Sequence, residues 1–449
     1  FCSPSTMYQA GTVAAFAVVT MTSLIPYNLF MNAHEYFNYK LRNATDLSVM
    51  VDEDLLAAVS GFRNHSTIGI EPTTDLQRSY EGWFTVTSGF TCILGALVNT
   101  VTTNRLSNSF RVLFGHAIVL LSLVPTLAYT FMDTDQDQTH FFWMTMLFSS
   151  ISSFASSGLI GAGIQGLAAA YSASYVRVVM IASAVAGIST SVLSIVCQAA
   201  TDNAILNGRI YFGIAFVWTF LSIFCYLYLV SAGPTKEIIE MEADGSPIVD
   251  DIDDEEEDEL ELRGEAVSPT SSSSLFDGWG AILKQSGPDI LCTMFVILVS
   301  CSAFPALASQ VRTQTANQTW RAYFSSICCF LLYSCCDGLG RVFAMRINIS
   351  RRQLQNLSLA RLLLLPLIAV CDVQPRHHSP TLIRNDAAFV FFNMSLALSF
   401  GFCYTHAYVK AVQSVEPSLK EKAGSMLSLA SNLVGLTGSA IGVAIVALM

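Results

Sequence analysis

Asp337 and Arg341 are the two residues whose charge and spacing most directly suggest chemistry. They stand four positions apart inside an apolar stretch that runs from about Tyr323 to Met345, so on a helix they share one face. A charged side chain within a membrane is costly and almost always faces the interior of a bundle or an aqueous path. The pair is therefore a candidate for holding a polar ligand. A buried ion pair that fixes the helix register is an equally weighted alternative.

An aromatic and a polar residue share the helical face of the charged pair. Phe330 and Ser334 precede it on the same helical face. In another apolar run, Gln165 follows Gly161 by four positions. An amide in hydrocarbon must find a partner, either on another helix or in a ligand, and the residues alone leave both meanings of Gln165 open.

The first apolar run carries a third candidate surface. Leu24, Tyr27 and Met31 recur at helical spacing beside Pro26, which is expected to bend the helix. An aromatic ring and a thioether at such a bend can floor an apolar pocket for a ring-shaped compound. Ordinary core packing is the more frequent meaning of such a stripe.

These residues lie in a chain with the composition of a membrane protein. Of its 449 residues, 52% are hydrophobic and only 13% are charged, whereas soluble proteins carry roughly 25% charged residues. Apolar runs of about 20 residues, the length that spans the hydrocarbon core, recur eleven times. We therefore expect an all-α polytopic membrane protein with eleven transmembrane helices. The runs lie near 8–32, 82–103, 108–131, 140–171, 175–200, 209–232, 288–310, 320–346, 357–373, 386–411 and 420–448.

Loop charges predict the orientation. Three short connections near 104–111, 346–356 and 410–422 carry Arg and Lys residues and fall on one side, which the positive-inside rule assigns to the cytoplasm. The N-terminus is then cytoplasmic, and an odd number of spans places the C-terminus outside. The first outer loop contains glycosylation sequons at Asn43 and Asn64, which agrees with this orientation.

An acidic segment divides the chain. Residues 237–265 hold 15 of the 34 acidic residues and one base, and such dense like charge predicts disorder. We expect a six-helix bundle over 1–232, a disordered cytoplasmic loop over 233–285 and a five-helix bundle over 286–449. A solvated linker is favoured over a partner-binding tail as the meaning of the acidic segment, and its partners are unknown.

Several short motifs make the chain similar to a known family. Residues Leu24 to Met31, Leu-Ile-Pro-Tyr-Asn-Leu-Phe-Met, resemble the first-helix signature of the equilibrative nucleoside transporters, Leu-Pro-Trp-Asn-Phe-Phe-Met. Asp337-Gly-Leu-Gly-Arg341 resembles the family's Asp-Trp-Leu-Gly-Arg. Further resemblances, in order along the chain, are Asn99 to Arg111, Gly161 to Gly166, Phe304-Pro305, Ala360 to Leu362 with Pro366, and Ala423-Gly424.

The resemblance implies facilitative, uncoupled transport of nucleosides, with nucleobases as a second substrate class. Alternating access between two bundles in a major-facilitator-like arrangement would need no cofactor, no ATP and no enzymatic activity. The implied partners are the nucleoside and the lipid bilayer, and no nucleic acid. The plasma membrane is favoured over endosomal or lysosomal membranes.

The resemblance also implies roles for individual residues. By motif position, Gln165 would bond the edge of the nucleobase, and Asp337 and Arg341 would hold the ribose hydroxyls. A nucleoside offers a flat ring, an amide-like edge and a diol, which suit stacking, an amide and a carboxylate–guanidinium pair. The walls of the site would be formed by Leu24, Tyr27, Met31, Phe304 and Phe330, with Ser334 in place of a family asparagine.

The chain departs from the family pattern at several of these positions. The family's first-helix tryptophan is Tyr27, and the tryptophan after the span-eight aspartate is Gly338. Gly89 and Cys92 stand where bulky apolar residues are usual in the second span. Substrate preference among purines, nucleobases and other ring compounds is therefore open.

Three other functions stand as alternatives. A monoamine or organic-cation carrier of the same fold should carry a further intramembrane acid near the site, and Asp337 is the one acid that we place deep within a span. A proton-coupled carrier needs a carboxylate that titrates, whereas the charge of Arg341 favours the ionised form. A non-transporting receptor or scaffold would use the acidic segment as its contact.

Overall fold

The regular structure of the protein is helical. A computed structural model describes residues 4–42, 74–103, 105–201, 203–231, 278–374, 376 and 381–449. Within these ranges the one β-type pairing is an isolated bridge between Val311 and Val373. The sequons at Asn43 and Asn64 and the acidic segment lie outside the described residues.

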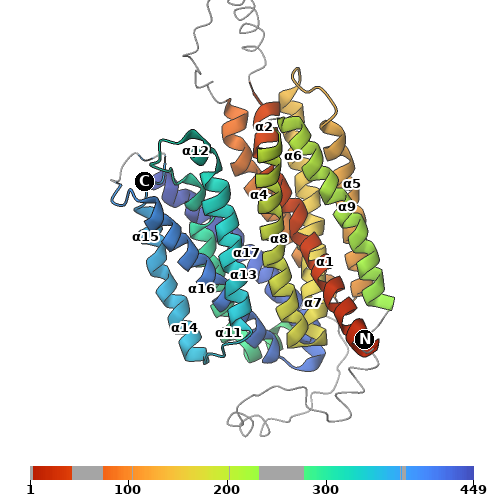
Figure 1. The fold of residues 1–449 in the computed structure, drawn as a ribbon. Coiled ribbons are helices and arrows are strands. Elements are labelled where there is room, and N and C mark those ends of the chain that lie inside the picture. Colours follow the sequence, from red (N-terminus) through yellow and green to blue (C-terminus); the bar gives the residue numbers. More distant parts are fainter. Residues whose placement is uncertain are drawn as a thin grey trace, which may run out of the picture.

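The helices before residue 232 gather in one half of the molecule, drawn from red to yellow-green in Figure 1. They are α1 (Pro4–Asn32), α2 (His34–Lys40), α4 (Asp75–Thr102), α5 (Asn108–Tyr129), α6 (Gln138–Ser153), η1 (Phe154–Gly161), α7 (Ala162–Tyr171), α8 (Ala173–Ala200) and α9 (Ala204–Ser231).

The helices after residue 277 gather in the other half, drawn from green to blue in Figure 1. They are α11 (Trp279–Ala303), η4 (Ala308–Gln310), α12 (Gln318–Phe324), η5 (Ser325–Leu331), α13 (Leu332–Ala344), α14 (Arg351–Ala360), η6 (Arg361–Leu363), α15 (Leu364–Ala369), α16 (Asp386–Gln413), η7 (Pro417–Leu419) and α17 (Lys420–Leu448).

Ten helical runs in the described residues are long and apolar enough to cross a membrane. They coincide with ten of the eleven predicted spans. The predicted ninth span, 357–373, falls instead on α14, η6 and α15, which follow one another along one side of the bundle (Figure 1). Pro366 in α15 has no N–H to bond the carbonyl of Leu362, and the chain forms a 3₁₀ turn there. The predicted ninth span is thus not a single long helix.

The helices extend beyond the apolar runs. α11 begins at Trp279, so the predicted loop over 233–285 ends too late by several residues. Hydropathy marks the part of a helix that lies in hydrocarbon, whereas helical hydrogen bonding continues past it. Gly278, with φ of 81°, precedes the helix, and this left-handed conformation suits glycine.

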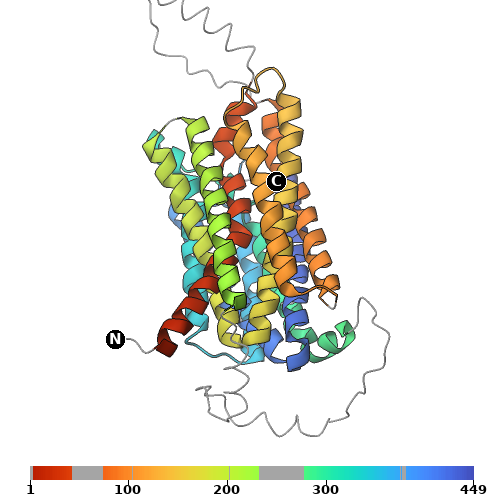
Figure 2. The same ribbon diagram turned by 90° about the vertical axis from the view of Figure 1, so that its right-hand side faces the viewer.

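The two ends of the bundle carry different parts of the chain (Figures 1 and 2). We call one end of the bundle the inner end. It carries the N-terminal end of α1 and also Ser231 and Gly278, which flank the acidic segment. The outer end carries α2 and the C-terminus. Because successive spans alternate in direction, the three basic connections singled out in the sequence share the inner end.

Two spans contain a π-helical segment in their middle. η1 directly precedes α7, which carries Gln165, and η5 directly precedes α13, which carries Asp337 and Arg341. Such π turns frequently occur at functional sites. Phe330 lies in η5 and Ser334 in α13, so the uniform helical stripe predicted from the sequence holds only from Ser334 onward.

The two halves share apolar packing near the inner end. One hydrophobic cluster unites residues of both halves there, including Ile164 and Val179 from the first half and Tyr408 and Leu427 from the second. Near the outer end, the second half has a separate cluster around Leu307, Phe324, Phe389 and Met449. The halves are therefore joined by a common core at the inner end, and the outer part of the second half has its own.

Glycines allow α13 and α16 to pack backbone against backbone. A Cβ added at Gly340 would lie 2.2 Å from the carbonyl oxygen of Leu398, and one at Gly401 would lie 2.0 Å from that of Asp337. Small residues permit such approach between membrane helices. This contact fixes the helix of the charged pair against α16.

We expect Gly340→Ala to lower the stability of the protein by about 1–3 kcal/mol, because the new methyl group must displace the Leu398 carbonyl. Thermal unfolding of the purified protein in detergent measures this loss. Gly213→Ala on α9 is the matched control, since a Cβ there meets nothing within 4 Å and alanine favours helix. An unfolding temperature equal to that of the control would contradict the packing argument.

Candidate functional site

Asp337 and Arg341 form a buried ion pair on α13. Arg341 Nε donates to Asp337 Oδ1 at 2.9 Å, and the two residues are 7% and 5% exposed, respectively. Their spacing places them on one helical face, as the sequence predicts. Within the described ranges, no hydrogen bond reaches Asp337 Oδ2 or Arg341 Nη2. The pair therefore keeps one acceptor and one donor for a ligand.

Arg341 also connects the two halves. Its Nη1 donates to the carbonyl oxygen of Met180 on α8 at 2.7 Å. Its guanidinium carbon lies 5.4 Å from the ring centre of Tyr404 and 5.7 Å from that of Phe400, within reach of a cation–π interaction. The charge of Arg341 is thus compensated by groups on α13, α8 and α16.

Two tyrosines on α16 link the ion pair to Gln165. The rings of Tyr404 and Tyr408 lie 5.8 Å apart, and the Tyr408 hydroxyl donates to Gln165 Oε1 at 2.8 Å. Gln165 is half-buried, and its Nε2 makes no hydrogen bond within the described part of the chain. A chain of contacts from Arg341 to Gln165 therefore joins the eighth span to the fourth. The sequence analysis overlooked both tyrosines, although their four-residue spacing was visible.

Aromatic rings form an apolar surface above the charged pair. Phe304 stacks on Tyr333 with ring centres 3.8 Å apart and an interplanar angle of 8°. Phe330 meets Phe304 edge-on at 5.6 Å. Tyr333 precedes Asp337 by one helical turn, so the rings lie beside the ion pair. The structure brings Phe304 and Phe330 together and adds Tyr333, which the sequence analysis did not identify.

Leu24, Tyr27 and Met31 are half-buried on α1 and pack against the common core. Tyr27 lies within electrostatic range of the thiols of Cys92 and Cys301. Because Cys301 belongs to the second half, Tyr27 faces the division between the halves. No hydrogen bond or ring contact among the described residues joins these three side chains to the charged pair.

Gly338 and Ser334, the two positions on α13 that differ from the family pattern, lie where the two halves approach closely. A Cβ at Gly338 would lie 3.5 Å from the Cβ of Ala184 on α8, and a Cβ at Gly187 would lie 3.0 Å from Ser334 Oγ. A larger side chain at position 338 would extend into this contact. Gly338 and Ser334 therefore lie in the interface with α8.

Arg361 is a second buried guanidinium near the site, and it is fully engaged by its own half. Nη1 donates to the Val296 carbonyl at 2.9 Å, Nε donates to Ser399 Oγ at 3.0 Å, and Nη2 bonds the Ser300 hydroxyl. These contacts tie η6 to α11 and α16. Arg361 therefore has a structural role, because it holds three elements of the second half together.

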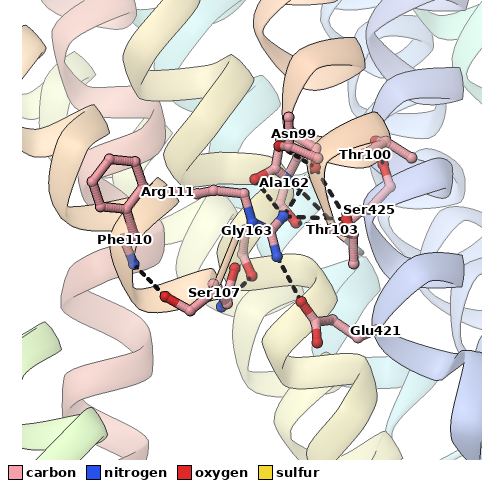
Figure 3. Close-up of polar contacts among 12 residues, drawn as sticks. Asn99, Thr100, Thr103, Ser107, Phe110, Arg111, Ala162, Gly163, Glu421 and Ser425 are labelled. Atoms are coloured by element: carbon pink, nitrogen blue, oxygen red, sulfur yellow. Dashed lines mark hydrogen bonds and ion pairs between the residues drawn. The ribbon is translucent and has the colours of Figure 1, made fainter. Parts of the chain in front are cut away.

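A further ion pair crosses between the halves at the inner end (Figure 3). Arg111, near the start of α5, donates through Nη2 to Glu421 Oε1 at 2.7 Å and through Nη1 to Asn99 Oδ1 at 2.8 Å. The side chain of Arg111 is 2% exposed and that of Glu421 is 37% exposed. Glu421 opens α17 in the second half, so the pair bridges both halves at their common core.

Ser425 extends this bridge by hydrogen bonds. Its hydroxyl donates to the Ala162 carbonyl at 3.2 Å, and Thr100 Oγ1 donates to its carbonyl oxygen at 3.2 Å. A Cβ at Gly166 would lie 2.6 Å from Ser425 Oγ, so glycine lets α7 approach α17. We name Asn99, Arg111, Glu421 and Ser425 the inner-end cluster. The sequence analysis found the motif from Asn99 to Arg111 and missed Glu421, whose signal was an acid at the start of the last span.

Comparisons with known proteins identify relatives along almost the whole chain. Residues 144–447 match a family model described as nucleoside transporter. The chain is 26% identical over 437 residues to Equilibrative nucleoside transporter 1 of Homo sapiens, covering 95% of this chain and 94% of that protein. It is 25% identical over 442 residues to Equilibrative nucleoside transporter 2 of Homo sapiens, covering 92% of each.

Solved structures share the fold. The proton:xylose symporter XylE, of the major facilitator superfamily, superposes with a TM-score of 0.62 at 12% identity and covers 97% of this chain and 88% of its own. The human organic anion transporter MFSD10 superposes with a TM-score of 0.50 at 13% identity, covering 99% and 95%. The predicted major-facilitator-like fold is confirmed. Since the family model covers well over half of the chain, this multi-pass membrane protein belongs to the nucleoside transporter family.

Proposed function

We propose that the protein carries nucleosides across a membrane by facilitated, uncoupled diffusion, through alternating access of a central site. Family membership supports the substrate class and the mode of transport. The observation that carries the site is the buried Asp337–Arg341 pair, which retains a free acceptor and a free donor. The family is one of transporters, and we propose no enzymatic activity.

The free groups suit the parts of a nucleoside. Asp337 Oδ2 accepts a hydrogen bond from one ribose hydroxyl, and Arg341 Nη2 donates a hydrogen bond to the other. A diol suits both groups because each hydroxyl can donate and accept. Gln165 presents Nε2 to an acceptor on the nucleobase while Tyr408 holds its oxygen. Six further side chains complete the walls of the proposed nucleoside site: Leu24, Tyr27, Met31, Phe304, Phe330 and Ser334.

The joined inner end supports alternating access. The halves share a core and the inner-end cluster there. Opening toward that side requires the Arg111–Glu421 pair to separate, whereas the outer core of the second half stands apart. We propose that this structure is the state closed at the inner end, and that rocking of the halves exposes the site to the other side.

The inner end is proposed to face the cytoplasm. It carries the three basic connections and the flanks of the acidic segment, in line with the positive-inside rule. The C-terminus then lies outside or in the lumen, with glycans proposed at Asn43 and Asn64. We propose the plasma membrane as the site of residence.

The cation-carrier alternative gains no support from the one other buried acid in the described spans. Asp289 on α11 is 5% exposed. Its Oδ2 lies 3.3 Å from Arg351 Nη2 and accepts from the Ser414 hydroxyl at 3.4 Å, near the inner end. Because Asp289 is already paired with Arg351, it offers no free counter-charge to a cationic substrate.

We expect Arg341→Ala to reduce uptake of radiolabelled adenosine and uridine to below about a tenth of that of the unmodified protein, since charge-assisted hydrogen bonds are each worth about 1.5–3 kcal/mol. Surface labelling should show as much of the Arg341→Ala protein at the membrane as of the unmodified protein. Arg352→Ala, at an exposed position of the inner end, is the control and should keep full uptake. Loss of the Arg341→Ala protein from the membrane would instead assign the pair a structural role.

We expect Glu421→Gln to open the inner end more often, because it removes the charge that holds Arg111 across the halves. With Glu421 partly exposed, the loss is about 1 kcal/mol, roughly a fivefold shift between states. A Thr100→Cys reporter, at a buried position that bonds Ser425 of the cluster, should then react faster with a thiol reagent in inside-out vesicles. Equal rates with and without Glu421→Gln would contradict the proposed closure.

We expect uptake to be nearly independent of pH, because the one carboxylate of the proposed site is already paired with a guanidinium. Initial rates of adenosine uptake at about pH 5.5 and about pH 7.4 should agree within about twofold. Adenosine-driven acidification of the interior of loaded vesicles should be absent. Uptake that rises severalfold at the lower pH would indicate proton coupling instead.

A further inference from the structure

Asn432, on the last helix, carries a buried hydrogen-bonding group without a partner. Its Nδ2 is buried and makes no hydrogen bond within the part of the chain that the structure describes. Buried polar side chains are nearly always hydrogen-bonded, and an amide in the hydrocarbon region has no bulk water to turn to. The amide thus has a capacity that the protein itself leaves unused.

The register of α17 against α4 places Asn432 at the boundary between the halves. Ser425 bonds Thr100 on α4, and Leu436 fills the space beside Gly89, 2.7 Å from a Cβ placed there. Eleven residues separate the contacts on each helix, and the helices run in opposite directions. Asn432 shares the face of Ser425 and Leu436 at helical spacing, so it lies at the level of Cys92.

Neighbouring contacts connect this position with the proposed nucleoside site. Tyr27 lies within electrostatic range of both Cys92 and Cys301. Cys301 in turn lies 4.0 Å from a Cβ placed at Gly435, one turn beyond Asn432 on α17. Ser431, next to Asn432, lies near Tyr404, whose ring centre is 5.4 Å from the guanidinium carbon of Arg341. Asn432 is therefore flanked by the walls proposed for the base and by the ring next to the ribose pair.

We propose that Asn432 is a second amide that recognises the nucleobase, an inference that rests on the proposed nucleoside transport. The oxygen of Gln165 already accepts a hydrogen bond from Tyr408, which leaves one of its two lone pairs for a ligand. Asn432 offers a donor and an acceptor on one carboxamide. An asparagine pairs with two points on the N6/N7 edge of adenine, so Asn432 favours purine nucleosides that carry an exocyclic amino group.

The test compares two purine nucleosides that differ only at that edge. We expect Asn432→Leu, and likewise Asn432→Ala, to lower kcat/KM for adenosine uptake roughly five- to tenfold, the effect of losing one or two neutral hydrogen bonds. Uptake of the purine riboside without the amino group should change less than about twofold. Thr437→Val is the matched control, since Thr437 is exposed on α17 and bonds only its own helix at Leu433.

A stability measurement separates recognition from a structural role. Without substrate, the Asn432 variants should unfold at the temperature of the unmodified protein, because Nδ2 has no hydrogen-bond partner to lose within the described residues. Adenosine should raise that temperature less for the variants than for the control. A lower unfolding temperature of both variants without substrate, or equal losses for the two nucleosides, would overturn the assignment. Absence of all nucleoside uptake by the unmodified protein would overturn the proposed function, and the inference with it.

Discussion

Every polar group within a bilayer must be satisfied by the protein or by a ligand, and the rest of this structure follows from that constraint. Arg341 meets it with a carboxylate, a carbonyl and two aromatic faces. Arg361 meets it with the hydroxyls and carbonyls of its own half. Asp337, Arg341, Gln165 and Asn432 each keep a polar group that makes no hydrogen bond within the described residues, and these four lie at the boundary between the halves. They are therefore the groups available to a polar substrate in a medium that offers no other partner.

Backbone proximity is the means by which these side chains are held. Gly340 and Gly401 bring α13 against α16, and Gly166 brings α7 against α17. A side chain at any of these positions would force its helix partner to shift, because an added Cβ would lie within 2.6 Å of it. The π-helical segments η1 and η5 stand directly before the helices that carry Gln165 and Asp337. Close backbone contacts along α7 and α13 thus accompany irregular backbone directly before each helix.

Much of the fold could be predicted from the sequence, because hydropathy and charge act over whole segments. The spans, their alternation and the ion pair at four-residue spacing depend on such averages. Pro366 is a local signal for the 3₁₀ turn at Arg361, whereas no local pattern in η1 or η5 predicts the π turns. Likewise, the link from Arg341 through Tyr404 and Tyr408 to Gln165 joins residues far apart in the chain, and no local pattern encodes it. Glu421 had a local signal, an acid in the first turn of the last span, but its partner Arg111 lies far away in the chain.

The uneven distribution of apolar packing has a consequence for the resting state. The core that the two halves share lies near the inner end, and the outer core of the second half is separate, so reversal must exchange buried area at the inner end for buried area at the other. The difference between these two areas sets how often an empty carrier waits on each side. An imbalance of about 1.4 kcal/mol gives a tenfold preference. A carrier that has no energy source can therefore still differ in apparent affinity between its two faces, although it cannot concentrate its substrate.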